Sequence, residues 1–187
     1  MMKRGVLSFA LVATLLGSRT DYLSAQRKFQ QIEKSQVKPG ARIQLSSEEI
    51  NSYVAAELPK VAPSGIRNPK VVLRGANTAT GYALIDFIKL RSAQGKPPGW
   101  LLRQLLQGEH EVSVQARVRS GGGSATVDLQ SVEVAGVPIS GAALDFLIQN
   151  YVLPNYPEAK IGRPFKLHKR VDSLEVQPGT AFVVIKR

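Results

Sequence analysis

The chain has 187 residues and a formal net charge of +11, with 43% hydrophobic and 21% charged residues. This composition is typical of a globular protein and excludes a disordered one. The chain contains no cysteine, which excludes disulfide bonds, thiolate catalysis, zinc–thiolate sites and a lipidated N-terminal cysteine.

The first 25 residues have the order of a secretory signal. Lys3 and Arg4 precede an uncharged apolar run over residues 5–17, and small residues follow near Ala25. The apolar run is too short to cross a bilayer as a helix, which needs about 20 residues. We therefore expect residues 1–25 to be a signal peptide cut near Ala25, and the protein to be exported to the periplasm or the cell exterior.

The positive charge bears on the partners that the protein can attract. Residues 1–25 carry three cations and one anion, which leaves a net charge of about +9 on the rest of the chain. A basic exported protein is attracted to anionic surfaces such as phospholipid headgroups and acidic glycans. Nucleic acid is not an expected partner in that compartment. The alternative is that the charge only keeps the protein soluble.

The chain after the signal is expected to form one domain over residues 43–187, preceded by a polar tether over residues 26–42. Ser46 can cap a helix, and Glu49 stands three residues later, which is the spacing of a capping box. Pro59 is expected to end this helix.

The spacing of apolar residues then changes to two, which predicts strands. Short strands are expected at residues 70–74 and 82–90. The second is apolar on both faces and is interrupted only by Asp86. We expect both of its faces to be covered, with Asp86 buried beside a partner or lining a cavity.

The residue pattern in the middle of the chain predicts a helix and a β-hairpin. Residues 100–107 carry leucines on one side and follow two prolines, as a short helix does. Residues 109–119 and 124–134 alternate as strands, joined by a glycine-rich turn. The apolar parity of the second strand switches near residues 130–131, which predicts a β-bulge.

The last part predicts one more helix and a strand pair. Ser140 can cap the helix, whose apolar stripe is Leu144, Leu147, Ile148 and Tyr151. Strands are expected at residues 165–177 and 181–187. The order of elements predicts an α+β fold, a curved antiparallel β-sheet of about six strands packed by two to three α-helices. The expected core residues are Ile85, Val114, Val127, Leu144 and Leu147.

Patterns for catalysis and for metal binding are scarce. Residues 35–38 match S-x-x-K, but the companion motifs of that enzyme family are absent. On a strand, His110 points away from Glu109 and Glu111, so the three side chains do not converge on a metal ion. We therefore expect a protein that is not an enzyme and holds no metal or cofactor.

Five residues are candidates for ligand contact. Lys166, His168 and Arg170 would share one strand face and meet an anion; the alternative is a solvated face. Trp100 lies off its leucine stripe near Arg103, as in interfacial membrane contacts; the alternative is an ordinary, partly buried tryptophan.

The two-sided strands and leucine-rich helices favour a groove for an apolar ligand. The pattern of residues 45–53, of the alternating strands and of residues 134–139 resembles bacterial exported relatives of the tubular lipid-binding proteins. This resemblance implies an envelope protein that accommodates lipid. We expect a non-catalytic protein that binds a lipid or an anionic amphiphile, with contact to a membrane surface. The alternative is a basic surface-binding module for an anionic glycan or a protein partner, without a ligand cavity.

Overall fold

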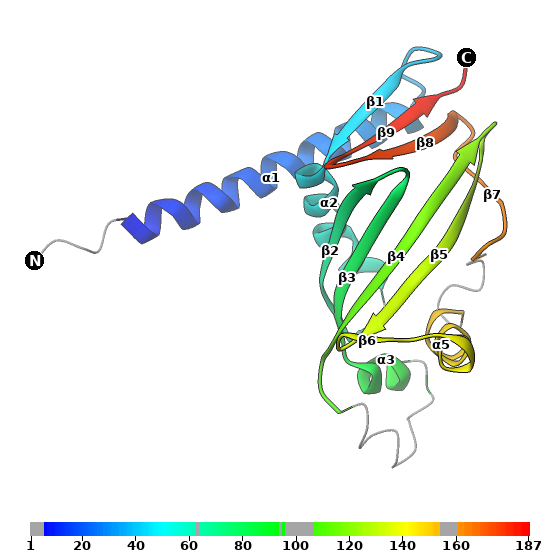
Figure 1. The fold of residues 1–187 in the computed structure, drawn as a ribbon. Coiled ribbons are helices and arrows are strands. Elements are labelled where there is room, and N and C mark those ends of the chain that lie inside the picture. Colours follow the sequence, from blue (N-terminus) through cyan, green and yellow to red (C-terminus); the bar gives the residue numbers. More distant parts are fainter. Residues whose placement is uncertain (1–5, 63, 94, 96–106, 154–160) are drawn as a thin grey trace, which may run out of the picture.

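The fold is α+β, as the sequence predicts, with one six-stranded and one three-stranded antiparallel sheet (Figure 1). It is known from a computed structural model, which describes residues 6–62, 64–93, 95, 107–153 and 161–187. Within these residues, no helix is both long enough and apolar enough to cross a membrane.

The large sheet is a meander to which two short strands are added. Its strands are β2 (Ile66–Gly75), β3 (Thr78–Ile85), β4 (His110–Gly121), β5 (Ser124–Val134), β6 (Val137–Pro138) and β7 (Phe165–Lys166). Strands β6 and β7 both pair with β5. Gly122 and Gly123 form the turn from β4 to β5, and both have positive φ, as a two-residue hairpin turn requires.

The predicted bulge in β5 is confirmed by the register. Gln115 pairs with Ser131 and Ala116 pairs with Leu129, so Gln130 is the extra residue. The bulge has a structural consequence, because it changes the parity of β5 at this point. Val127 and Leu129 before it, and Val132 and Val134 after it, all pair with even-numbered residues of β4. One apolar face therefore continues along the whole strand.

The strand expected over residues 82–90 is wrong in its second half. Strand β3 ends at Ile85, and a helix, α3 (Phe87–Ala93), follows. Asp86 is buried, and its carboxylate accepts a hydrogen bond from the Lys89 N–H at 2.9 Å, as a helix cap does. This hydrogen bond outweighs the effect of burial and lowers the pKa of Asp86. A short run that is apolar on both faces fits a buried helix as well as a strand, which is why its spacing misled the prediction.

The small sheet has the order β1 (Arg42–Ser46), β9 (Thr180–Ile185) and β8 (Val171–Gln177). The strand expected over residues 165–177 is therefore two strands, β7 and β8, in two different sheets. The Leu167 N–H donates to the Gly123 carbonyl and the Val171 N–H donates to the His168 carbonyl, so the chain turns between them.

Helix α1 (Val6–Glu33) runs through both the expected cut and the first part of the expected tether. Its first half extends away from both sheets (Figure 1). Its last turns belong to the core: Ala25 has 0% and Ile32 has 5% of its surface exposed. They pack against buried residues of the small sheet, which are Leu45, Val171, Val183 and Ile185.

Helix α2 (Ser47–Val61) begins with the predicted capping box. The Glu49 N–H donates to Ser46 Oγ at 3.1 Å, and Glu49 Oε2 accepts from the Ser46 N–H at 2.9 Å. Pro59 does not end the helix, which continues to Val61. Proline removes its own N–H donor and crowds the carbonyl four residues earlier, but the Ala62 N–H still bonds the Leu58 carbonyl at 2.7 Å, so the last turn is kept.

The last helix is α5 (Gly141–Leu147), which continues as one turn of π-helix, η1 (Ile148–Val152). Ser140 occupies the N-cap position, as expected, but its side chain makes no capping hydrogen bond. Helices α3, α5 and η1 lie at the end of the large sheet farthest from α1 (Figure 1). The second buried cluster lies here and consists of Phe87, Leu90, Val112 and Tyr151. Three expected core residues, Ile85, Val114 and Leu147, pack against it. Val127 and Leu144 are partly buried.

Candidate functional site

An apolar cavity lies between the large sheet and the helices α3, α5 and η1. Its volume is about 220 Å³, and the fourteen described residues that line it are all hydrophobic. Val112 and Val114 line it from β4, and Leu144 and Leu147 line it from α5. A site with this lining can hold an alkyl chain, but its volume is below the about 300–1,000 Å³ of sites for drug-sized ligands. The geometry therefore fits one short chain.

The sequence builds this lining from two periodicities. Val112 and Val114 share a face of β4 because side chains two apart on a strand point the same way. Val132 pairs with Val114 across the hairpin, and the bulge at Gln130 places it on that face. On the opposite wall, Leu144 and Leu147 are three residues apart and so lie on one side of α5. Two sequence patterns thus predict parts of the lining, without predicting that a space remains between them.

Aromatic and cationic groups form a row beside this cavity. The rings of Phe87 and Tyr151, which both line it, meet edge to face with centroids 5.2 Å apart. The Arg91 guanidinium carbon lies 5.8 Å from the centre of the Tyr151 ring. The His110 ring lies 6.1 Å from the Phe87 ring at the other end of the row. Arg91 Nε and His110 Nε2 are both buried and have no hydrogen-bond partner within the part of the chain that the structure describes.

The electrostatics of this row are those of a half-buried cation among neutral described groups. Arg91 donates to Asn150 Oδ1 at 3.1 Å. Burial raises the pKa of the Tyr151 phenol, and the neighbouring Arg91 opposes this rise without cancelling it. The ion pairs among the described residues do not include Arg91. The sequence analysis did not single out Arg91. It considered His110 only as a possible metal ligand and argued against that role.

Of the five predicted ligand residues, the three that the structure describes do not line this cavity. Trp100 and Arg103 lie outside the described residues. Lys166 is exposed on β7, opposite Ser124, and His168 is exposed in the turn after it. Arg170 is half-buried and donates to the Val37 carbonyl at 3.1 Å. The expected single basic strand face is absent over residues 165–170, because the strand breaks there.

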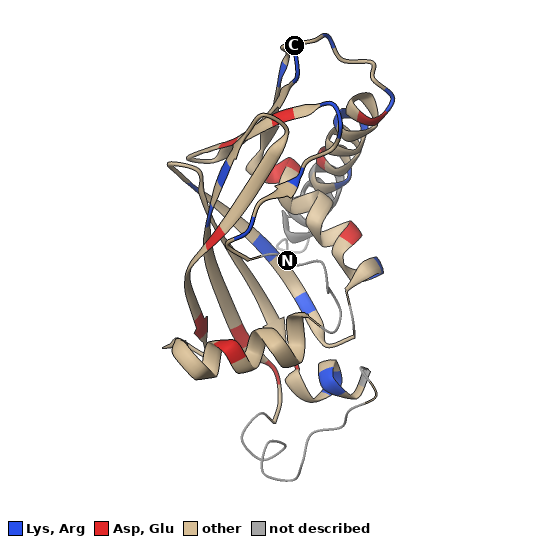
Figure 2. Ribbon diagram, turned by 90° about the vertical axis from the view of Figure 1, so that its right-hand side faces the viewer, with Lys and Arg blue, Asp and Glu red and all other residues tan. Residues whose placement is uncertain are grey.

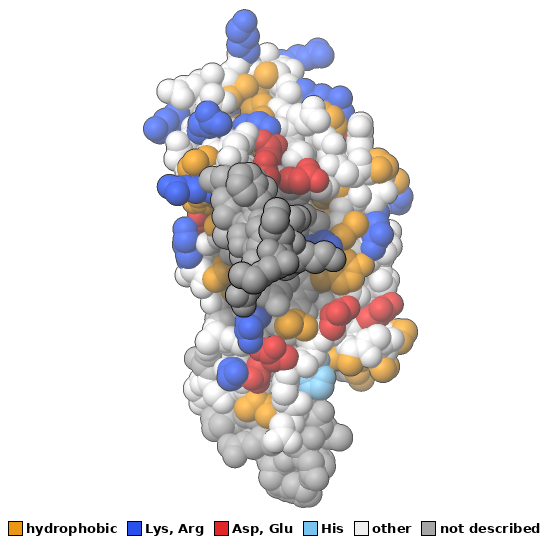
Figure 3. All heavy atoms as spheres, turned by 90° about the vertical axis from the view of Figure 1, so that its left-hand side faces the viewer, with side chains coloured by type: hydrophobic (Ala, Val, Ile, Leu, Met, Phe, Trp, Pro, Cys, Tyr) orange, Lys and Arg blue, Asp and Glu red, His pale blue; other side chains and the backbone are white. Residues whose placement is uncertain are grey.

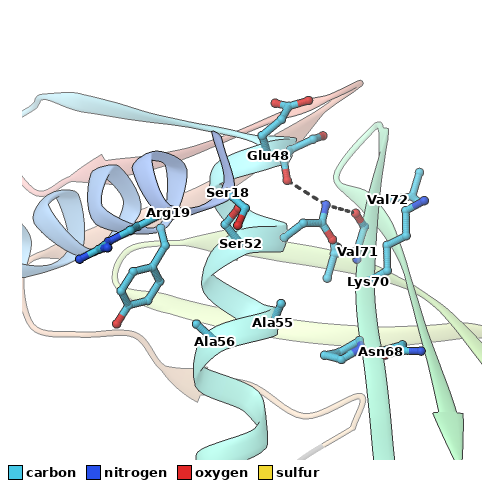
Figure 4. Close-up of a pocket in the computed structure, with 14 residues that line it drawn as sticks. Ser18, Arg19, Glu48, Ser52, Ala55, Ala56, Asn68, Lys70, Val71 and Val72 are labelled. Atoms are coloured by element: carbon cyan, nitrogen blue, oxygen red, sulfur yellow. Dashed lines mark hydrogen bonds between the residues drawn. The ribbon is translucent and has the colours of Figure 1, made fainter. Parts of the chain in front are cut away.

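A second, more open concavity of about 960 Å³ lies between α1, α2 and β2 (Figure 4). Ala55, Ala56 and Val72 contribute apolar surface, and Arg19 and Lys70 are its cations. Figure 4 shows the short Ala55 side chain on the side of α2 that faces β2, and the Ala56 side chain on the other side of the helix.

Asn51 joins α2 to the edge of the large sheet in this concavity. Its Oδ1 accepts from the Val71 N–H at 2.7 Å, and its Nδ2 donates to the Val71 carbonyl at 2.9 Å. The amide side chain thus replaces a neighbouring strand at Val71 on the edge strand β2. Protecting an edge in this way prevents pairing with another chain, so the arrangement is structural.

On the faces drawn in Figures 2 and 3, the charged side chains do not form one basic surface. Figure 2 shows Lys and Arg distributed over α1 and both sheets, and Figure 3 shows them interspersed with acidic and apolar side chains. Among the described residues, no group of three or more His, Asp or Glu side chains is placed to hold a metal ion. Neither a protein-family model nor a curated protein sequence matches the chain. The function is therefore inferred from the geometry of the cavity.

Proposed function

We propose that this protein binds an amphiphile whose apolar tail occupies the cavity between the large sheet and α3, α5 and η1. The supporting observation is the uninterrupted hydrophobic lining of a volume of about 220 Å³. An engineered apolar cavity of about 150 Å³ already stays dry and binds benzene. The resemblance to exported relatives of the tubular lipid-binding proteins points to the same class of ligand.

The apolar lining also supports a ligand on energetic grounds. The site is partly open, so its hydrophobic side chains meet solvent when the site is empty. Burying apolar surface gains about 25 cal/mol per Å², so an alkyl chain that covers this lining is favoured. A ligand of this kind is a reason for the sequence to retain small and medium side chains there.

The proposal is tested by calorimetric titration with straight-chain alcohols of increasing length. Burying a methylene gains about 0.8 kcal/mol, so the affinity should rise about fourfold per carbon until the cavity is full. Val114→Phe fills the cavity from β4 and should lower the affinity at least tenfold. Val118→Phe, on the same face of the same strand but outside the lining, is the matched control and should change it less than twofold.

Two outcomes would contradict the proposal. One is the absence of binding for every chain length. The other is binding to anionic vesicles that ignores chain length and disappears in salt, because exposed charges are screened within about 10 Å at 0.1 M. The second outcome would favour the alternative function, a basic module that binds anionic glycans or a protein partner through its surface.

The proposed place of action is the periplasm or the cell exterior, and the proposed role is non-catalytic. The order of charged, apolar and small residues over residues 1–25 supports export. Fractionation of the host cell, followed by N-terminal sequencing, tests this proposal and locates any cut. Recovery of the chain only from the cytoplasm would refute export.

A further inference from the structure

We infer that the cavity takes a single-chain carboxylate amphiphile, such as a medium-chain fatty acid, whose head group is held by Arg91. This inference rests on the proposed function and adds the chemistry of the head group. It is carried by the position of Arg91 over Tyr151, a residue of the cavity wall.

The first step concerns the charge of the half-buried Arg91, which no carboxylate among the described residues pairs with. Withdrawing a charged group from water is costly unless it is paired and hydrogen-bonded. Arg91 donates to the neutral amide of Asn150 and also interacts with the Tyr151 phenol, and its Nε is buried without a hydrogen-bond partner within the described residues. Other arginines at the surface, such as Arg67 with Glu109, have a carboxylate beside them. Arg91 thus has donor capacity and charge that suit an anion from outside the chain.

The second step concerns where this charge lies. Arg91 stands on α3 and packs over Tyr151, whose ring is part of the cavity wall. When the tail occupies the cavity, the head group that follows it lies beside this wall, next to the row of side chains. An arginine offers planar donors that match the two oxygens of a carboxylate. The guanidinium therefore provides the charge, and the cavity provides the apolar part.

The third step concerns the size of the ligand. A volume of about 220 Å³ leaves room for one chain of medium length. This volume excludes a two-chain phospholipid lying wholly within the cavity.

The experiment compares decanoate with 1-decanol, which have the same chain length and differ in the head group. Calorimetric titration at pH 7.5 should show decanoate binding at least tenfold more tightly than decanol to the unmodified protein. Arg91→Met should reduce decanoate binding at least tenfold and change decanol binding less than twofold.

Arg67→Met is the matched control, since Arg67 is an exposed arginine at the same end of the sheet whose partner is Glu109. It should change neither affinity. Decanol binding also reports whether each variant keeps a folded cavity.

The outcomes separate the two proposals. If decanol binds but decanoate binds no more tightly, or if Arg91→Met weakens both ligands equally, the inference on the head group is overturned and the proposed function stands. If neither ligand binds to the unmodified protein, the proposed function fails as well. Arg91→Lys keeps the charge but not the planar donors, and an intermediate loss with this variant would support direct contact with the carboxylate.

Discussion

Substitution of Glu49 should lower the stability of this fold strongly, because this buried residue connects α1 to the start of α2. Its Oε1 accepts from Ser24 Oγ at 2.5 Å and from Lys28 Nζ at 2.6 Å, both on α1. Its Oε2 accepts from the Ser46 N–H at 2.9 Å, completing the capping box. Only 7% of the residue surface is exposed. The substitution Glu49→Gln keeps the shape of the side chain and removes its charge.

The expected loss of stability follows from these contacts. A hydrogen bond to a charged group contributes about 1.5–3 kcal/mol, and removing one partner of a buried ion pair costs about 3–5 kcal/mol. The Lys28 side chain is 30% exposed, so water can solvate its ammonium once the carboxylate is gone, which reduces the cost. We expect Glu49→Gln to lower the free energy of unfolding by about 2–3 kcal/mol, which corresponds to a lower Tm by about 5–10 °C.

The assay is urea unfolding followed by far-ultraviolet circular dichroism. Glu48→Gln is the matched control, because Glu48 is the exposed neighbour in the same helical turn, and it should lose clearly less stability than Glu49→Gln. A double-mutant cycle with Lys28→Met should give a coupling free energy of at least about 1 kcal/mol. Equal stability of the two Gln variants, or a coupling of zero, would refute the reasoning.

The pH dependence gives an independent check on the same residue. Burial acts to raise the pKa of Glu49, but hydrogen bonds from Lys28, Ser24 and the Ser46 N–H outweigh it, so the pKa is lowered from 4.5. A carboxyl group whose pKa is lower in the folded state stabilises the protein above its unfolded pKa. This stabilisation is lost as the pH falls through the folded value. The difference between the unmodified protein and Glu49→Gln should therefore be full at pH 7 and shrink below pH 4.5.

Two further predictions concern helix ends and the chain start. Asp86→Ala removes the cap of α3 and should cost about 1–2 kcal/mol at pH 7. Because the Lys89 N–H lowers the pKa of Asp86 below 3.8, the cap stabilises fully above 3.8, and its contribution is lost as the pH falls through the folded pKa; a cost that is the same at every pH would contradict the cap. A chain that begins at Gln26 lacks the fully buried Ala25 and the hydrogen bond from Ser24 to Glu49, and should be about 2 kcal/mol less stable than one that begins at Ser18. Equal Tm values for the two chains would show that these last turns of α1 contribute nothing.

The sequence by itself determined the features that depend on neighbouring residues. Ser46 and Glu49 form the capping box because three-residue spacing brings each side chain to the other's backbone. The turn at Gly122 and Gly123 follows from residues that accept positive φ. The bulge at Gln130 follows from a switch in apolar parity, and the register shows it. Together these local rules were sufficient for the α+β class.

The tertiary structure alone decided where short apolar runs ended and which ones met. Residues 82–90 have one apolar pattern, yet they divide into β3 and α3 at the buried cap Asp86. Residues 165–177 divide because β7 pairs with β5 while β8 pairs with β9. Ala25, assigned to an apolar leader by its neighbours in sequence, is buried in a cluster built from the far end of the chain. A short stretch of sequence does not contain its distant pairing partner, so its own pattern cannot predict the pairing.

The candidate site shows the same division. The stripe of Leu144 and Leu147 and the alternation of Val112 and Val114 are visible in the sequence, because helices and strands repeat with fixed periods. The cavity between them is a residual volume set by how far α5 packs from the sheet, and no period encodes it. Arg91 reaches its partner Asn150 across 59 positions of sequence. Such a contact exists only once the chain has folded, which is why the row beside the cavity became visible only in three dimensions.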